Sequence, residues 1–129
     1  MKDILKAYSD DHLKMSEIIF VFAQEVLALA RTARSRENAI LLAVVAWNIA
    51  LQPEKYHEPL IVEFISTLHV QEGSEEWLAG IEIMESLILK KQTEYPWVFR
   101  SIHWFEFHED GQDQQLKIVA SISFSQSIH

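Results

Sequence analysis

A run of thirteen residues, Ala39–Leu51 (AILLAVVAWNIAL), constrains the fold more than any other feature, because Asn48 is its one polar side chain. A helix that is apolar on every side has no face to present to water, so it belongs at the centre of a core. A membrane span needs about 20 apolar residues. This run is shorter and has charged residues near both ends. We therefore predict a buried helix over residues 36–52, capped by Ser35 and ended before Pro53.

Three further helices are predicted from apolar residues that recur at helical spacing. The first spans residues 2–33, either unbroken or with a second start near Ser9-Asp10-Asp11, and its apolar face is wide enough to contact more than one neighbour. The second spans residues 59–70, because proline is suited to the first turn of a helix. The third spans residues 75–92, with Ser74 as its N-cap.

Three arginines, Arg31, Arg34 and Arg36, fall at the end of the first predicted helix and in the turn after it. Cations at that end complement the negative pole of the helix dipole, and this is the role we favour. A site for a phosphate or for an acidic partner is the alternative.

The hydrophobic period changes from helical to alternating near Tyr95. Residues 97–108 and 114–124 alternate as strands do, and Asp110-Gly111 between them is a typical hairpin turn. A turn centred there places Phe105 opposite Leu116 and His103 opposite Ile118. The predicted core face is then Phe99, Phe105, Phe107, Leu116, Ile118, Ala120 and Ile122.

The other face of the predicted hairpin is mostly polar but includes Ile102, Trp104 and Val119, which would meet there as an apolar patch. Lys117, opposite Trp104 in this register, can lie over the indole ring. A two-stranded hairpin is marginally stable by itself. Either the helices of the same chain cover this patch, or a second chain does.

The predicted fold is therefore α+β and mostly α, with a four-helix-bundle-like core closed by a C-terminal antiparallel β-hairpin. We expect one domain over residues 1–129, because a chain of this length buries about two-thirds of its unfolded surface. The charged N-terminus does not resemble a secretory signal, so a cytoplasmic location is expected.

Composition removes several classes of chemistry. The chain has no cysteine, so thiolate catalysis and Cys-ligated metals are excluded. Its three glycines are isolated and form no phosphate-binding loop. A net charge of −8 counts against general nucleic-acid binding. We predict no catalytic residue, no cofactor and no membrane association, and we favour a protein that is not an enzyme.

The best local arrangement for a metal is Glu54-x-x-His57, but dimetal sites in helical bundles need a second such unit, which is missing. We therefore predict no metal. Glu106 and His108 share a hairpin face, with Asp113 opposite the histidine. They are expected to be a surface pair, with acid–base chemistry as the alternative.

Two polar residues at apolar positions are candidate ligand-binding residues. Asn48 lies within the central helix, where its amide needs partners because an unpaired buried polar group costs about 1–3 kcal/mol. His103 lies on the predicted core face of the hairpin. Each either makes a structural hydrogen bond or lines a pocket between the hairpin and the helices.

Two functions of different class remain. The first is a non-enzymatic protein-interaction or regulatory module that homodimerises through the hairpin, using its edge and Ile102, Trp104, Lys117 and Val119. The second is an enzyme or small-molecule-binding protein whose pocket involves His103 and Asn48.

Overall fold

The computed structural model describes residues 11–111 and 113–122. Five α-helices, one short 3-10 helix and one β-hairpin follow one another along this part of the chain. In order they are α2 (Asp11–Phe22), α3 (Gln24–Leu27), α4 (Ala33–Ala50), η1 (Glu54–Tyr56), α5 (His57–Ser66), α6 (Glu75–Glu94), β1 (Arg100–Asp110) and β2 (Asp113–Ile122).

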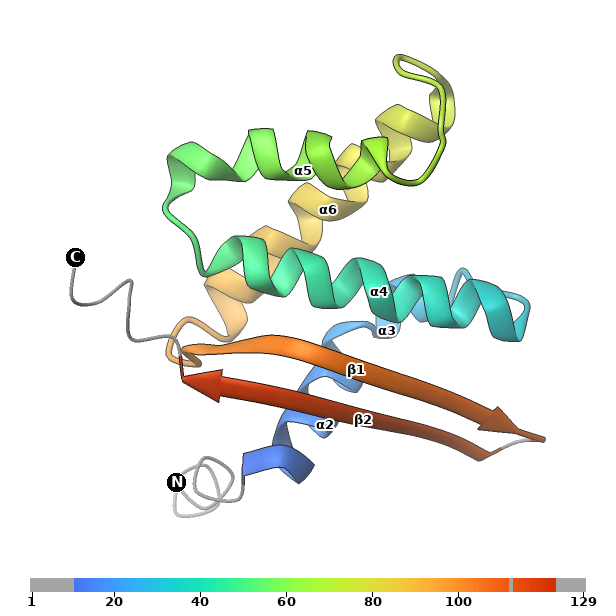
Figure 1. Cartoon of the computed structure of the whole chain (residues 1–129), viewed down its shortest axis with the longest axis vertical. Helices are drawn as coiled ribbons and strands as arrows, with labels where there is room; N and C mark the ends of the chain where they lie inside the picture. Colours follow the sequence, from blue (N-terminus) through green and yellow to red (C-terminus); the bar gives the residue numbers. More distant parts are fainter. Residues whose placement is uncertain (1–10, 112, 123–129) are drawn as a thin grey trace.

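Helix α4 is the central element, with α5 and α6 on one side and the hairpin on the other (Figure 1). Helix α2 packs against β2 and also contacts α4. None of residues 39–51 is exposed, as expected for a helix that is apolar all round. The predicted combination of helices with a C-terminal antiparallel hairpin is confirmed. A four-helix bundle is not confirmed, because the hairpin occupies one side of α4.

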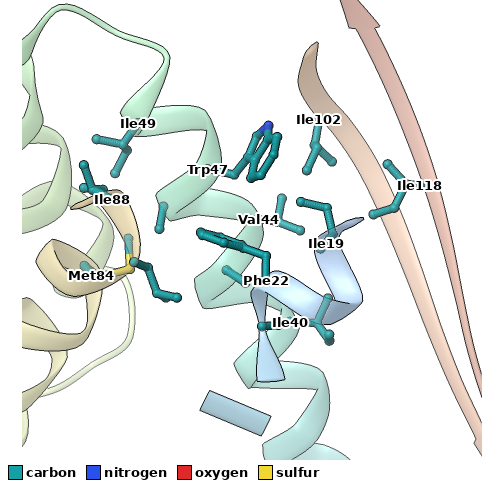
Figure 2. Close-up of a cluster of buried hydrophobic side chains, with 14 of the residues drawn as sticks. Ile19, Phe22, Ile40, Val44, Trp47, Ile49, Met84, Ile88, Ile102 and Ile118 are labelled. Atoms are coloured by element: carbon teal, nitrogen blue, oxygen red, sulfur yellow. The ribbon is translucent and has the colours of Figure 1, made fainter. Parts of the chain in front are cut away.

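The core gathers around α4 (Figure 2). Trp47 of α4 is fully buried, and its ring meets that of Phe22 from α2 in an edge-to-face contact with centroids 5.3 Å apart. Met84 of α6 and Ile118 of β2 line the core from opposite sides of α4. A single apolar cluster therefore joins the helices to the hairpin.

Helix α4 begins three residues earlier than predicted, because Thr32 rather than Ser35 is its N-cap. The backbone N–H of Ser35 donates to the Thr32 hydroxyl at 3.0 Å, and the Thr32 N–H donates to the Ser35 hydroxyl at 2.9 Å. This capping box holds Thr32 in an extended conformation. The prediction of one helix reaching residue 33 was therefore wrong: α3 ends at Leu27, and a turn precedes Thr32.

Helix α5 also differs from its prediction at both ends. It starts at His57, so Pro59 lies within the first turn, where no intrahelical N–H is required. It ends at Ser66 rather than near residue 70, after which the chain makes tight turns and His69 has a positive φ of 59°. Helix α6 begins after Ser74, whose hydroxyl accepts the N–H of Trp77 as predicted.

The hairpin turn lies one residue later than predicted. Asp110 pairs with Asp113, and Gly111, with a φ of 63°, takes the first central position of the turn. Phe105 therefore opposes Ile118, not Leu116. Between the turn and Trp104, this shift of two residues between partners keeps the side chains on their predicted faces. Residues 123 and 124 of the second predicted strand lie outside the described residues.

A β-bulge interrupts the ladder between Ile102 and Trp104, so that His103 is an extra residue in β1. In the part of β1 that precedes the bulge, the side chains lie on the face opposite to the predicted one. Ile102 joins Phe107, Ile118 and Ala120 in the core, whereas Phe99, predicted to be in the core, is 60% exposed. Alternation alone cannot reveal an inserted residue, which explains why this part of the face prediction was wrong.

Candidate interaction surface on the hairpin

The exposed side of the hairpin is called its outer face here and comprises His103, Trp104, Glu106, His108, Lys117, Val119 and Ser121. Trp104 and Val119 lie directly opposite each other in the ladder and are 50% and 44% exposed. A large apolar pair with this much surface in water is the feature that most resembles a binding site. Phe99, just before β1, adds further exposed aromatic surface.

Because of the bulge, the residues on the outer face differ from those predicted for the apolar patch. Ile102 is only 5% exposed and packs in the core, so its predicted place on the same face as Trp104 and Val119 was wrong. His103 was predicted on the core face but is exposed, with its Nε2 against the hydroxyl of Ser121. The structure thus places His103 on the same exposed face as Trp104 and Val119, and places Ile102 in the core.

The outer face carries both acidic and basic side chains. Glu106 lies opposite Lys117, and Nε2 of His108 is 2.8 Å from Oε2 of Glu106. Two predicted pairings were wrong because of the register: Lys117 does not oppose Trp104, and His108 opposes Gln115 rather than Asp113. The apolar pair therefore has a local acid and a local base beside it.

Asn48 joins the central helix to the hairpin. Its Nδ2 donates to the carbonyl of Ile102 at 2.8 Å, and its Oδ1 accepts the N–H of the same residue at 2.8 Å. The neighbouring Trp47 indole donates to the carbonyl of Arg100 at 2.7 Å. The helix thereby supplies the partners that another strand would give, and this part of the β1 edge is closed.

Arg36 makes a second connection, near the hairpin tip. Its Nε and Nη2 donate to the two carboxylate oxygens of Glu109 at 2.5 and 2.6 Å. These hydrogen bonds, with another from Gln114, hold the pKa of Glu109 below its usual range. The predicted dipole role of Arg34 and Arg36 was wrong, because both lie in the first turns of α4, at its positive end.

Lys91 is a buried cation that sequence reasoning missed. The residue is 3% exposed, and its Nζ donates to the carbonyl of Tyr95 at 2.6 Å and lies 4.7 Å from the centre of the Trp47 ring. Burial lowers the pKa of Lys91 to about 8. Two consecutive lysines at a helix end look like ordinary dipole partners, so the pattern gives no signal that one is enclosed.

Two hollows lie between the hairpin and the helices in the part of the chain that the structure describes. One of about 240 Å³ lies between α2 and β2, and another of about 160 Å³ lies near the tip beside Arg34 and Glu109. Neither is lined by His103 or Asn48. Both are smaller than the roughly 300–1,000 Å³ of usual small-molecule pockets.

His57 is buried and its Nε2 lies 2.7 Å from the carbonyl of Gln52, which ties the start of α5 to the chain just after α4. Glu54, which forms the Glu54-x-x-His57 arrangement with it, lines an open hollow beside Lys55 and Glu58. Within residues 11–111 and 113–122, no three histidine or carboxylate side chains gather as metal ligands would.

No protein-family model, curated protein or solved structure matches this chain. In the described part of the chain, no helix has both the length and the apolar character needed to cross a bilayer.

Proposed function

We propose that this protein is a non-enzymatic interaction module that forms a homodimer through the outer face of its hairpin. The observation that carries this is the exposed cross-strand pair Trp104 and Val119. Tryptophan buries a large apolar area and is enriched among residues that dominate binding energy. The closed β1 edge at Ile102 favours contact through the face over strand addition at that position.

The charges favour a second copy of the chain as the occupant. A two-fold interface brings the same patch of both subunits together, so the patch must complement itself. Glu106 and Lys117 give the outer face one acid directly opposite one base. Elsewhere a net charge of −8 makes two copies repel. Contact through a locally balanced face reduces that repulsion.

Sedimentation velocity of the full chain tests the proposal. We expect a monomer–dimer equilibrium in the micromolar range, and we expect Trp104→Glu to weaken association by at least about tenfold, since it puts a carboxylate in the apolar centre of the interface. Leu78→Glu is the matched control, because Leu78 is 56% exposed on α6, away from the hairpin. It should sediment as the wild type does.

A wild-type chain that remains monomeric at about 0.1 mM would overturn the proposal. So would a dimer that is unaffected by Trp104→Glu, or one that both variants weaken equally. Circular dichroism of each variant establishes that the comparison is made between folded chains.

A further inference from the structure

A second surface, remote from the hairpin, lies between α3 and α6. It is a hollow of about 200 Å³, called the α3–α6 groove here. Its lining residues are Glu25, Val26, Leu29, Glu82, Ile83, Ser86 and Leu87. On α6 these residues are spaced as one face of a helix, so the groove follows the helix axis.

The floor of the groove is apolar and incompletely covered. Val26 on one wall and Ile83 and Leu87 on the other provide the floor. Leu29, two residues after α3 ends, is 71% exposed, more than any other large hydrophobic residue in the described part of the chain. Covering the exposed surface of Leu29 with an apolar group is favourable, because it removes apolar surface from water.

The rim of the groove is acidic on both sides. Glu25 comes from the α3 wall, and Glu82 from the α6 wall. Lys90 approaches Glu25 to 4.0 Å, but it also donates to the carbonyl of Phe22 at 3.3 Å, and the Glu25 side chain remains 77% exposed. In the part of the chain that the structure describes, Glu82 has no ion-pair partner.

We propose that the α3–α6 groove binds a basic amphipathic helix of a partner protein. Leucine-like side chains of that helix pack on Val26, Leu29 and Ile83, while flanking lysine or arginine side chains reach Glu25 and Glu82. An apolar strip flanked by opposite charge is the usual way in which a helix is recognised in a groove. An acidic partner would meet repulsion from both walls.

The test uses the full chain and a fluorescent synthetic helix of leucine and lysine, about 18 residues or five turns long. Fluorescence anisotropy should detect saturable binding. The double variant Glu25→Lys/Glu82→Lys should weaken it by at least about tenfold, because both rim charges are reversed. A peptide of the same leucine pattern with glutamate for lysine should not bind.

The matched control is Glu58→Lys/Glu63→Lys, which changes the net charge by the same amount on the exposed side of α5. It should alter affinity by less than about twofold if the groove, and not overall charge, attracts the helix. Leu29→Ser should weaken binding by about fivefold, whereas Leu89→Ser, at a leucine that is 60% exposed outside the groove, should not.

Absence of saturable binding by the wild type would overturn this assignment. Equal weakening by the two charge reversals would do so as well, since it would reveal general attraction to an acidic protein. A fall in the sedimentation coefficient on Leu29→Ser would mean that a second copy of the chain covers the groove. That result would also overturn it.

Discussion

The hairpin is attached to α4 at two places that use different chemistry. At its open end, Asn48 and Trp47 bond neutral backbone groups of Ile102 and Arg100. Near its tip, Arg36 bonds the charged side chain of Glu109. We call these the neutral anchor and the charged anchor.

The two anchors differ in how much water reaches them. Trp47 and Ile102 of the neutral anchor are buried and Asn48 is half-buried, whereas the side chains of Arg36 and Glu109 are 26% and 12% exposed. Partly exposed ion pairs are screened by salt and contribute little net stability. Losing the partner of a buried backbone group is more costly. The neutral anchor should therefore dominate the stability of the hairpin, and the charged anchor should make it sensitive to pH and salt.

The largest effect is expected from Asn48→Leu. Leucine is close to asparagine in size but leaves both the N–H and the carbonyl of Ile102 without their partner. The free energy of unfolding should fall by about 2–3 kcal/mol, measured by urea denaturation. Leu42→Met, at a half-buried position of the same helix, is a control that should cost less than about 1.5 kcal/mol. A loss in Asn48→Leu no larger than in the control would show that the neutral anchor contributes little.

A smaller effect on stability is expected from the titration of Lys91, whose side chain lies over Trp47 of the neutral anchor. Its pKa of about 8 is below the unfolded value of 10.5 because burial disfavours the charged form. The unfolded chain therefore binds more protons between these two values, and stability should increase with pH across that window. Between pH 7 and pH 9 the gain should be about 1 kcal/mol.

Lys91→Met supplies the control for this titration, since it keeps a long side chain and removes the ionisable group. Urea denaturation at pH 7 and pH 9 should show the slope in the wild type and a flatter dependence in the variant. If the two slopes are the same, Lys91 titrates in the folded chain as it does in the unfolded one.

The smallest effect on stability is expected when the charged anchor is removed. Glu109→Gln should lower the denaturation midpoint by less than Asn48→Leu does, and the difference from the wild type should shrink in high salt. The depressed pKa of Glu109 contributes stability above its ordinary value of 4.5, and this contribution is lost as the pH falls through the lower, folded value. The variant should therefore lose less stability than the wild type on acidification.

Glu106→Gln is the comparison for this last experiment, because it removes a carboxylate from the same strand without touching Arg36. A salt-independent loss in Glu109→Gln, or an equal acid response in both variants, would contradict the assignment of the charged anchor.

Much of the architecture could be predicted from local patterns. A helix formed by the apolar run at residues 39–51 must be buried, whichever elements cover it. The change from helical to alternating hydrophobic period near Tyr95 predicts a hairpin. The N-cap at Ser74 was also evident, because a cap depends on residues three apart in the sequence. The cap of α4 was misplaced, since Thr32 and Ser35 are both good capping residues and only their reciprocal hydrogen bonds decide between them.

The candidate surface could be predicted only in part. Trp104 and Val119 were placed on one face correctly, since both lie on the same side of the bulge as the turn that set the register. Ile102 and His103 were not, because one inserted residue reverses the faces beyond it and leaves no mark on the alternation.

The sequence by itself determined which segments are helical or extended and which helix must be enclosed, because those properties depend on neighbours a few residues apart. Tertiary structure alone decided that Asn48 meets Ile102, that Arg36 meets Glu109 and that Lys91 is enclosed. The first two contacts join residues 54 and 73 positions apart, and Lys91 is enclosed beside Trp47 of another helix. The final position of a helix or strand is set by packing of the whole core, so a local sequence pattern does not predict such a contact.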